Sequence, residues 1–266
     1  MKPAPFAYRP APSVAGALDV LATEDAVALA GGQSLIPLLN FRLARPEVLV
    51  DLNPLTELDH LEISQGSLRI GALTRQATLQ RSPAVAAGWP LLTEAVSHVG
   101  HAAIRNRGTV GGSVAHADPA AELPVALAAL DARFHLRSGS GERTLSASEL
   151  FRGPMTTALE TGELLVEIEV PPAAPGVRMA FLEHARTHGD FAVAGAAVVV
   201  VPGERAAIAL LGAAPVPVRA SAAERAFLEG ADGAEVARLA GADVGDRYRR
   251  ALLTTLTRRA LERVLA

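Results

Sequence analysis

The sequence has 266 residues, half of them hydrophobic and a fifth charged, which is typical of a globular protein and excludes a disordered chain. Its 25 basic and 28 acidic residues give a formal charge of −3, which argues against a general nucleic-acid binder. No cysteine is present, so this chain cannot itself hold a disulfide, a thiolate nucleophile, Cys-ligated zinc or an iron–sulfur cluster.

The sequence predicts no membrane span. Its longest uninterrupted apolar run, residues 191–201, ends at Pro202 and is far shorter than the roughly 18–20 residues that a spanning helix needs. Residues 1–12 contain four prolines and no apolar core of the kind found in secretory signals. We therefore expect a cytoplasmic location.

The first 55 residues alternate between helical and extended patterns. Apolar residues recur at helical spacing over 13–22. A short apolar strand follows at 26–30, and Ser34 is placed to cap a helix that continues through Leu43. A second strand over 48–52 closes this segment.

Residues 56–173 predict a hairpin followed by helices and further strands. Apolar residues that alternate on both sides of Gln65-Gly66 indicate the hairpin. The polar, glycine-rich stretch 105–113 is expected to be a loop, and Asp118 is a good N-cap for the helix that follows. The other expected elements are helices over 74–80, 89–99 and 120–130 and strands over 133–137 and 163–170.

The proline-rich run 171–176 is the strongest linker signal in the chain. The elements expected after it are strands over 178–184, 192–201 and 206–212 and helices over 220–229 and 247–265. These patterns predict an α+β protein with a cofactor domain over 1–173, divided into subdomains of about 1–55 and 56–173, and a smaller α+β domain over 177–266.

The first of two glycine motifs is Gly31-Gly32-Gln33-Ser34, between a predicted strand and a predicted helix. Glycines let the backbone approach a phosphate, and the free N–H groups of a helix start favour an anion. A tight turn that needs glycine only for steric reasons would give the same residues. The spacing matches neither G-x-G-x-x-G nor a P-loop.

The second motif, 104–113, combines three glycines, two hydroxyl groups and two arginines, which suits a diphosphate. Asp118 and Glu122 follow it and are placed to accept hydrogen bonds from ribose hydroxyls. A glycine-rich connection before a capped helix is the structural alternative. Two such motifs in one chain suggest one dinucleotide held from both sides.

Together, AGGQSLIPLLNFRLARPEVLVDLN and IRNRGTVGGSVAHADPAAELP resemble the FAD-binding medium subunit of the molybdenum hydroxylases. This family includes xanthine and carbon monoxide dehydrogenases, aldehyde oxidases and bacterial nicotine and quinoline hydroxylases. ELLVEIEVP and FLEHARTHGDFAVAGAAVVV match later segments, so the resemblance covers essentially the whole chain. It implies a two-part FAD-binding domain of the vanillyl-alcohol-oxidase type, followed by a small α+β C-terminal domain.

The resemblance also implies which residues contact FAD. The two motifs would hold the pyrophosphate. Glu122, with Asp118 close to it, would bind the adenine-side ribose, and Leu165 would contact the adenine end. Val99, Ile104 and Phe191 would lie near the flavin ring. The implied cofactor-binding residues are Leu29, Ala30, Gly31, Gly32, Gln33, Ser34, Leu35, Val99, Ile104, Thr109, Gly111, Gly112, Ser113, His116, Asp118, Glu122, Leu165 and Phe191. No catalytic acid or base is predicted, because the flavin carries the chemistry.

The sequence departs from the family pattern near its last matching segment. Relatives often carry a lysine where Leu182, Glu183 and His184 stand here, and Thr187 replaces a common arginine. His98 and His101 have a spacing that could suit a metal on a helix, but the residue pattern is too weak to predict a metal site.

The resemblance implies an electron-transfer subunit of a multi-subunit molybdenum hydroxylase. FAD would take electrons from a small iron–sulfur subunit, itself supplied by a large molybdenum-cofactor subunit, and pass them to an external acceptor, in a dimer of heterotrimers. A free-standing FAD oxidase or reductase of the same fold and a binding module without flavin are the alternatives. The lack of cysteine and of a third, substrate-binding domain disfavours the first alternative, and the intact glycine motifs disfavour the second.

Overall fold

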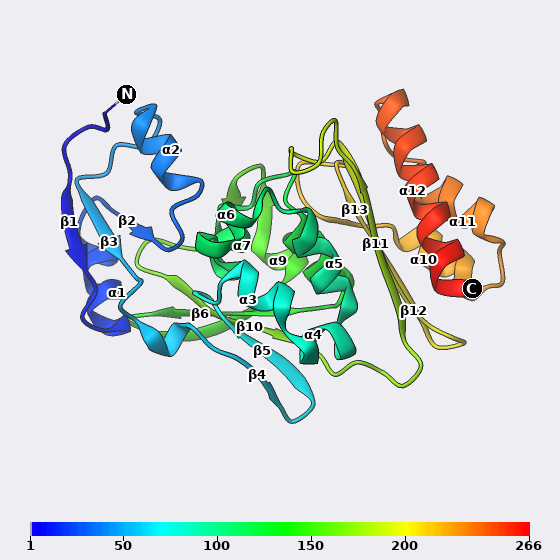
Figure 1. The fold of residues 1–266 in the computed structure, drawn as a ribbon, viewed down its shortest axis with the longest axis horizontal. Coiled ribbons are helices and arrows are strands. Elements are labelled where there is room, and N and C mark those ends of the chain that lie inside the picture. Colours follow the sequence, from blue (N-terminus) through cyan, green and yellow to red (C-terminus); the bar gives the residue numbers. More distant parts are fainter. Residues whose placement is uncertain (1) are drawn as a thin grey trace.

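Three larger β-sheets follow one another along the long axis of the molecule, and β8 and β9 form a small fourth one (Figure 1). The computed structural model describes residues 2–266. Each sheet lies within one of three successive parts of the chain, namely 2–55, 56–173 and 177–266. The first two sheets, with their helices, flank the cofactor site described below.

The first sheet is parallel, with its strands in the order β1 (Ala7–Pro10), β3 (Val48–Asp51) and β2 (Ala26–Leu29). Parallel neighbours require crossover connections, and α1 (Val14–Thr23) and α2 (Leu35–Asn40) supply them. Every residue of the central strand β3 is buried. The sheet therefore presents the carboxyl ends of β2 and β3 together, next to the first glycine motif.

The second sheet is antiparallel and carries most of the helices. Its strands are, in spatial order, β4 (Leu61–Ser64), β5 (Ser67–Gly71), β10 (Leu164–Val170), β6 (Arg133–Ser138) and β7 (Gly141–Ser146). The helices of this part are α3 (Gln76–Arg81), α4 (Pro83–Gly88), α5 (Pro90–His98), α6 (Ala102–Arg107), α7 (Val110–His116), α8 (Glu122–Ala129) and α9 (Ala147–Leu150). The short elements η1 (Thr56–Leu58), β8 (Phe151–Gly153) and β9 (Thr156–Thr157) complete it.

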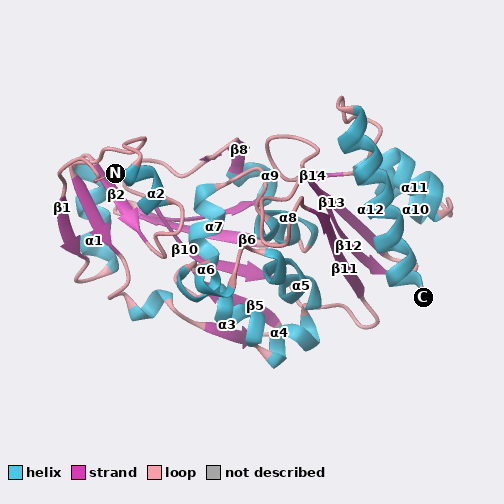
Figure 2. Ribbon diagram, turned by 45° about the horizontal axis from the view of Figure 1, so that its top comes forward, coloured by secondary structure: helices cyan, strands magenta, loops and turns pink. Residues whose placement is uncertain are grey.

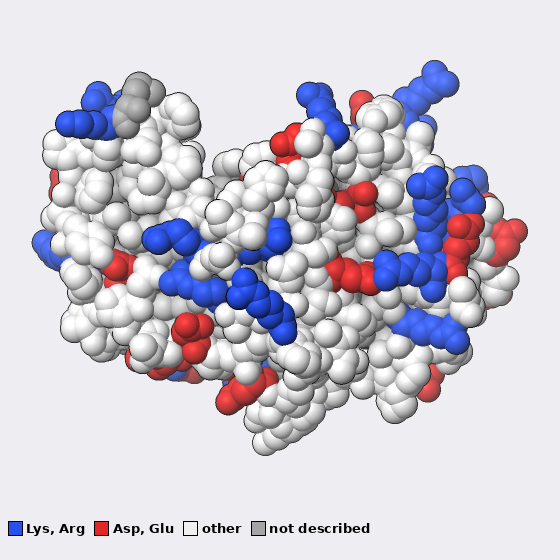
Figure 3. Space-filling model, in the orientation of Figure 1, with Lys and Arg blue, Asp and Glu red and all other residues white. Residues whose placement is uncertain are grey.

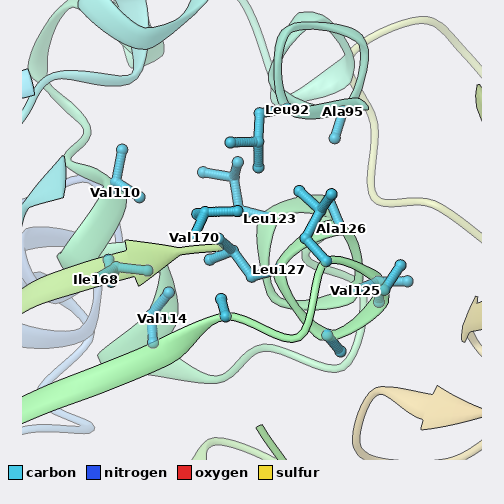
Figure 4. Close-up of a cluster of buried hydrophobic side chains, with 14 of the residues drawn as sticks. Leu92, Ala95, Val110, Val114, Leu123, Val125, Ala126, Leu127, Ile168 and Val170 are labelled. Carbon is cyan, nitrogen blue, oxygen red and sulfur yellow. The ribbon is translucent and has the colours of Figure 1, made fainter. Parts of the chain in front are cut away.

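Helix α8 is the centre of the main core. All eight of its residues are buried, including Glu122 at its first position. Figure 4 shows its apolar side chains between those of α5, α7 and the end of β10. Because α8 is enclosed on every side, its sequence is apolar all round and has no polar face.

The third sheet has the antiparallel order β11 (Arg178–His184), β12 (Ala194–Val201), β13 (Arg205–Leu211) and β14 (Val218–Arg219). Helices α10 (Ser221–Leu228), α11 (Gly233–Ala240) and α12 (Arg247–Leu265) cover one face, and α5 and α8 contact the other (Figure 2). Strand β12 is thus buried on both faces, which explains its unbroken apolar run. Within residues 2–266, no helix combines the length and apolar character required for a bilayer crossing.

Side-chain bonds join the second and third parts of the chain, among them those of Glu94 and Asp131. Glu94 on α5 accepts a hydrogen bond from the backbone N–H of Phe181 at 2.8 Å and also pairs with Arg263 of α12. Asp131 forms ion pairs with Arg205 and Arg219, both at 2.6 Å. The C-terminal part is therefore fixed against the helices that line the cofactor site.

The structure confirms most predicted elements to within a few residues, but several predictions are wrong. The stretch 105–113 is not a loop, because it contains the end of α6 and the start of α7. Asp118 does not cap α8, since its Oδ1 accepts from the N–H of Ala120 in the preceding turn. Ser34 makes no capping bond, and α2 ends at Asn40. Elements β1, β7, α4 and α11 lie where the sequence pattern predicted none.

Candidate cofactor site

A cavity of about 570 Å³ lies between the first sheet, the helices of the second part and the loop between β11 and β12. Figure 3 shows the surface hollowed between the N-terminal part and the helices α6 and α7. This volume is within the usual range for small-molecule and cofactor sites. The cavity is therefore large enough to hold a sizeable organic ligand.

Almost all of the predicted cofactor-binding residues line this one cavity. The predicted residues in its wall are Ala30, Gly32, Gln33, Ser34, Leu35, Val99, Ile104, Thr109, Gly111, Gly112, Ser113, His116, Asp118, Glu122, Leu165 and Phe191. Leu29 and Gly31 are not in the wall. The two glycine motifs, far apart in the sequence, are thus brought together.

The first motif offers unpaired backbone donors to the cavity. Gly32 has a φ of +73°, a conformation that glycine adopts without strain, and the chain turns there from β2 into α2. The backbone N–H groups of residues 32–35 have no hydrogen-bond acceptor among residues 2–266. Such a row of free N–H groups at the start of a helix suits phosphate oxygens.

The second motif uses its backbone donors within the protein. The N–H groups of Val110 and Gly111 donate to the carbonyls of Thr74 (2.9 Å) and Ala72 (3.0 Å). The N–H of Gly112 donates to Thr109 Oγ1, the cap of α7, at 3.0 Å. This motif therefore faces the cavity mainly through the side chains of α7, including Ser113 and His116.

Gly31 brings the two motifs into direct contact. A Cβ at this position would overlap the carbonyl oxygen of Arg107 and lie 2.8 Å from Cα of Gly108. Gly31 therefore permits the two backbones to touch behind the cavity wall. This close approach explains why glycine is needed here, and the contact of Gly31 with the pyrophosphate stays a prediction.

Arg75 and Asn53 also connect the two motifs, and the sequence analysis did not predict either as a site residue. Arg75 donates from Nη1 to the carbonyl of Arg107 (2.5 Å) and from Nη2 to Asn53 Oδ1 (2.6 Å). Asn53 Nδ2 in turn donates to the carbonyl of Ala30 at 3.0 Å. The polar pair Asp51 and Asn53 at the end of a buried strand was the available signal.

Glu122 is a buried acid in the cavity wall. It is 6 % exposed, and its own backbone N–H is the only group among residues 2–266 found to donate a hydrogen bond to its side chain. The pKa of Glu122 is raised to about 8, chiefly by burial; the carboxylates Glu183 and Asp118 contribute to the rise, while its own backbone N–H and His98 oppose it. A carboxyl group in this setting is available to a ligand that brings hydroxyl groups.

Glu183 pairs with His98 at the edge of the candidate site. His98 Nδ1 lies 3.3 Å from Glu183 Oε1, and this bond raises the pKa of His98. The second oxygen of Glu183 is buried without a partner among the described residues. His101 and His188 lie nearby, but residues 2–266 contain no group of three or more potential ligands placed to hold a metal.

One part of the cavity wall, which we call the apolar end, is formed largely by apolar groups. Val99, Gly100 and Ile104 line it from the connection between α5 and α6, and Phe191 lines it from the C-terminal part. Phe191 is 77 % exposed, so its ring is available for contact with a ligand. A flat aromatic ring system suits these walls, while a diphosphate suits the glycine-lined end.

A cavity lined by free backbone N–H groups, a buried acid and apolar side chains is typical of a dinucleotide-binding protein of the flavoprotein class. A family profile described as "FAD binding domain in molybdopterin dehydrogenase" matches residues 4–173, and the chain belongs to this family. The expected α+β fold and the cofactor FAD are thereby confirmed. The chain is an FAD-carrying electron-transfer subunit of a multi-subunit molybdenum hydroxylase.

Known relatives share most of their length with this chain. It is 45 % identical over 236 residues to 6-hydroxypseudooxynicotine dehydrogenase complex subunit alpha of Paenarthrobacter nicotinovorans, covering 86 % of this chain and 80 % of the relative. It is 41 % identical over 202 residues to the carbon monoxide dehydrogenase medium chain of Hydrogenophaga pseudoflava, covering 75 % and 70 % of the two.

Solved structures agree over the whole chain. A chain of Hydrogenophaga pseudoflava carbon monoxide dehydrogenase superposes with a TM-score of 0.94 and 37 % identity, covering 100 % of this chain and 99 % of that one. A chain of quinoline 2-oxidoreductase from Pseudomonas putida 86 gives a TM-score of 0.93 with the same identity and coverage. At these identities the likeness extends beyond the fold to the family.

Proposed function

We propose that the chain holds FAD in an extended form across the cavity, with its pyrophosphate on the first glycine motif and its ring at the apolar end. The observation that carries this proposal is the row of unpaired N–H groups at residues 32–35, facing the same cavity as the buried Glu122. Ser113 on α7 adds a hydroxyl from the opposite wall. Diphosphate binding at helix starts has the same physical basis.

The residues of this chain bind and orient the cofactor. FAD, when bound, accepts electrons and releases them. Glu122 binds the adenine-side ribose, with Asp118 beside it, and Leu165 contacts the adenine end. Val99, Ile104 and Phe191 contact the ring, and the exposed Phe191 leaves this end of the site open to solvent. The contact between the two motifs through Gly31 keeps the walls of the cavity at a fixed separation.

Replacing Glu122 with alanine is expected to weaken FAD binding by about 1.5–3 kcal/mol, the scale of a hydrogen bond to a charged group. The measurement is the dissociation constant of FAD at pH 9, where a carboxyl with a pKa of about 8 is ionised. Glu229→Ala, at the exposed end of α10, is the control. An unchanged constant would remove Glu122 from the site and leave Asp118 as the ribose acceptor.

We further propose that the chain works with a large molybdenum-cofactor subunit and a small iron–sulfur subunit, assembled as a dimer of heterotrimers. The chain has no cysteine with which to hold an iron–sulfur donor itself, and relatives are subunits of multi-subunit dehydrogenases. Phe191 at the open edge of the cavity leaves the ring end of the site accessible to an electron donor.

The test is anaerobic mixing of the FAD-loaded chain with candidate organic substrates, with and without the two partner chains. We expect rapid bleaching of the flavin absorbance only when both partners are present. The mass of the reconstituted complex reports the proposed dimer of heterotrimers. Rapid reduction of the isolated chain by a small organic substrate would instead support a free-standing oxidase.

A further inference from the structure

Arg105 of α6 donates hydrogen bonds to two carbonyl groups of the connection between α5 and α6. Its Nη1 donates to the carbonyl oxygens of Val99 (2.8 Å) and Gly100 (2.9 Å), and its Nε donates to Gln80 Oε1 at 3.0 Å. Gln80 belongs to α3, so the guanidinium ties this connection to a second helix. Both carbonyls are thus held on the side of the chain that faces Arg105.

Holding these carbonyls also fixes the direction of two N–H groups. In a planar trans peptide the C=O and the following N–H point in opposite directions. The N–H groups of Gly100 and His101 therefore point away from Arg105. Neither has a hydrogen-bond acceptor among residues 2–266.

The connection between α5 and α6 contributes to the cavity wall with residues other than Arg105. Val99, Gly100 and Ile104 line the cavity, whereas Arg105 does not. Gly100 has a φ of +44°, and a Cβ there would lie 2.8 Å from Cδ1 of Ile104, so the turn requires glycine. The connection thus presents bare backbone at the apolar end of the site.

We propose that Arg105 is a positioning residue that directs the N–H groups of Gly100 and His101 at an electron-rich oxygen or nitrogen of the flavin ring. This inference rests on the proposed position of FAD in the cavity. Reduction raises the electron density on the ring heteroatoms, and preorganised donors stabilise the more electron-rich state. Arg105 thereby makes the bound FAD easier to reduce, without contacting it.

The first experiment compares Arg105→Met and Arg105→Lys with Arg81→Met. Arg81 is an exposed arginine on the neighbouring helix α3, and its Nη2 donates a hydrogen bond to Asn106 Oδ1 at 3.3 Å. The control removes the same charge from the same face, where Figure 3 shows basic side chains gathered over α3 and α6. The readouts are the dissociation constant of oxidised FAD and the midpoint potential of the bound flavin.

We expect Arg105→Met to weaken the binding of oxidised FAD about fivefold, as for one lost hydrogen bond. The affinity for reduced FAD should fall about tenfold further than the affinity for oxidised FAD, which corresponds to a midpoint potential about 30 mV more negative. Arg105→Lys, which places a single ammonium near the two carbonyls, should give a smaller shift in the same direction. Arg81→Met should leave the potential unchanged.

A second measurement does not depend on the stability of any variant. Hydrogen exchange of the Gly100 and His101 amides in the wild-type chain is expected to slow when FAD is added. Unprotected amides in the FAD-loaded chain would overturn the inference, as would a normal potential in FAD-loaded Arg105→Met or an equal shift in Arg81→Met. A wild-type chain that binds no FAD would instead overturn the proposed function together with this inference.

Discussion

Replacing Gly111 with alanine is expected to lower the free energy of unfolding by about 1–3 kcal/mol, the scale of overpacking in a closed core. A Cβ on Gly111 would lie 2.6 Å from both Cβ and the carbonyl oxygen of Ala72. Ala72 cannot retreat easily, because its carbonyl accepts the N–H of Gly111 and its own N–H donates to the carbonyl of Val166. Helix α7 must therefore shift.

The measurement is the denaturant midpoint of the chain with and without FAD. The matched control is Gly88→Ala in α4, where a Cβ would meet no atom within 4 Å. This control should be neutral or more stable by up to about 1 kcal/mol, because alanine favours a helix. Wild-type stability in Gly111→Ala would contradict the close packing of α7 on Ala72. Because α7 must shift in Gly111→Ala, loss of FAD by this variant would not by itself show that Gly111 contacts a phosphate.

The FAD-free Glu122→Gln chain is expected to be more stable than wild type by a few kcal/mol at pH 9 and nearly equal to it at pH 4.5. The folded-state pKa of Glu122 is about 8, above the ordinary value of 4.5 that applies when the chain is unfolded. Between these two values the folded chain keeps a proton that the unfolded chain has released. Wild-type stability therefore falls as pH rises through this window, at about 1.4 kcal/mol per unit of pKa difference.

Glutamine has nearly the same shape as the protonated acid and does not ionise, so the variant lacks this loss. The measurement is the denaturant midpoint at intervals from pH 4.5 to 9. Glu229→Gln, at the exposed end of α10, is the control and should follow the wild-type profile. Parallel pH profiles for wild type and Glu122→Gln would show that the carboxyl is solvated and not buried.

Hydrophobic periodicity predicted the elements that bury one face or both. The hairpin β4–β5, the strands β11 to β13 and the long helix α12 lie close to their predicted positions. Helices α6 and α7 escaped prediction because both are short and α7 has two glycines in its first turn. Bonds from α7 to Thr74 and Ala72, far away in the sequence, stabilise its first turn. Strand β1 escaped prediction because all four of its residues are exposed.

The sequence predicted which residues line the site better than it predicted what each of them does there. Gly31 and Gly32 look alike in the sequence but are needed for different reasons. Two backbones touch at Gly31, whereas the chain turns beside the cavity at Gly32. Only the partner atoms distinguish these roles, and they come from other segments. Arg75 and Asn53 were missed for the same reason, since a polar residue that joins two segments resembles a solvated one in the sequence.

One edge of the third sheet is contacted by helix α5 and not by another strand. Strand β11 is the edge strand, and Glu94 of α5 satisfies one of its outward N–H groups, that of Phe181. An edge strand with free backbone groups is a template for pairing with a second chain. Until α5 has docked, newly made chains can therefore join edge to edge, and correct folding of the FAD domain protects the C-terminal domain from aggregation.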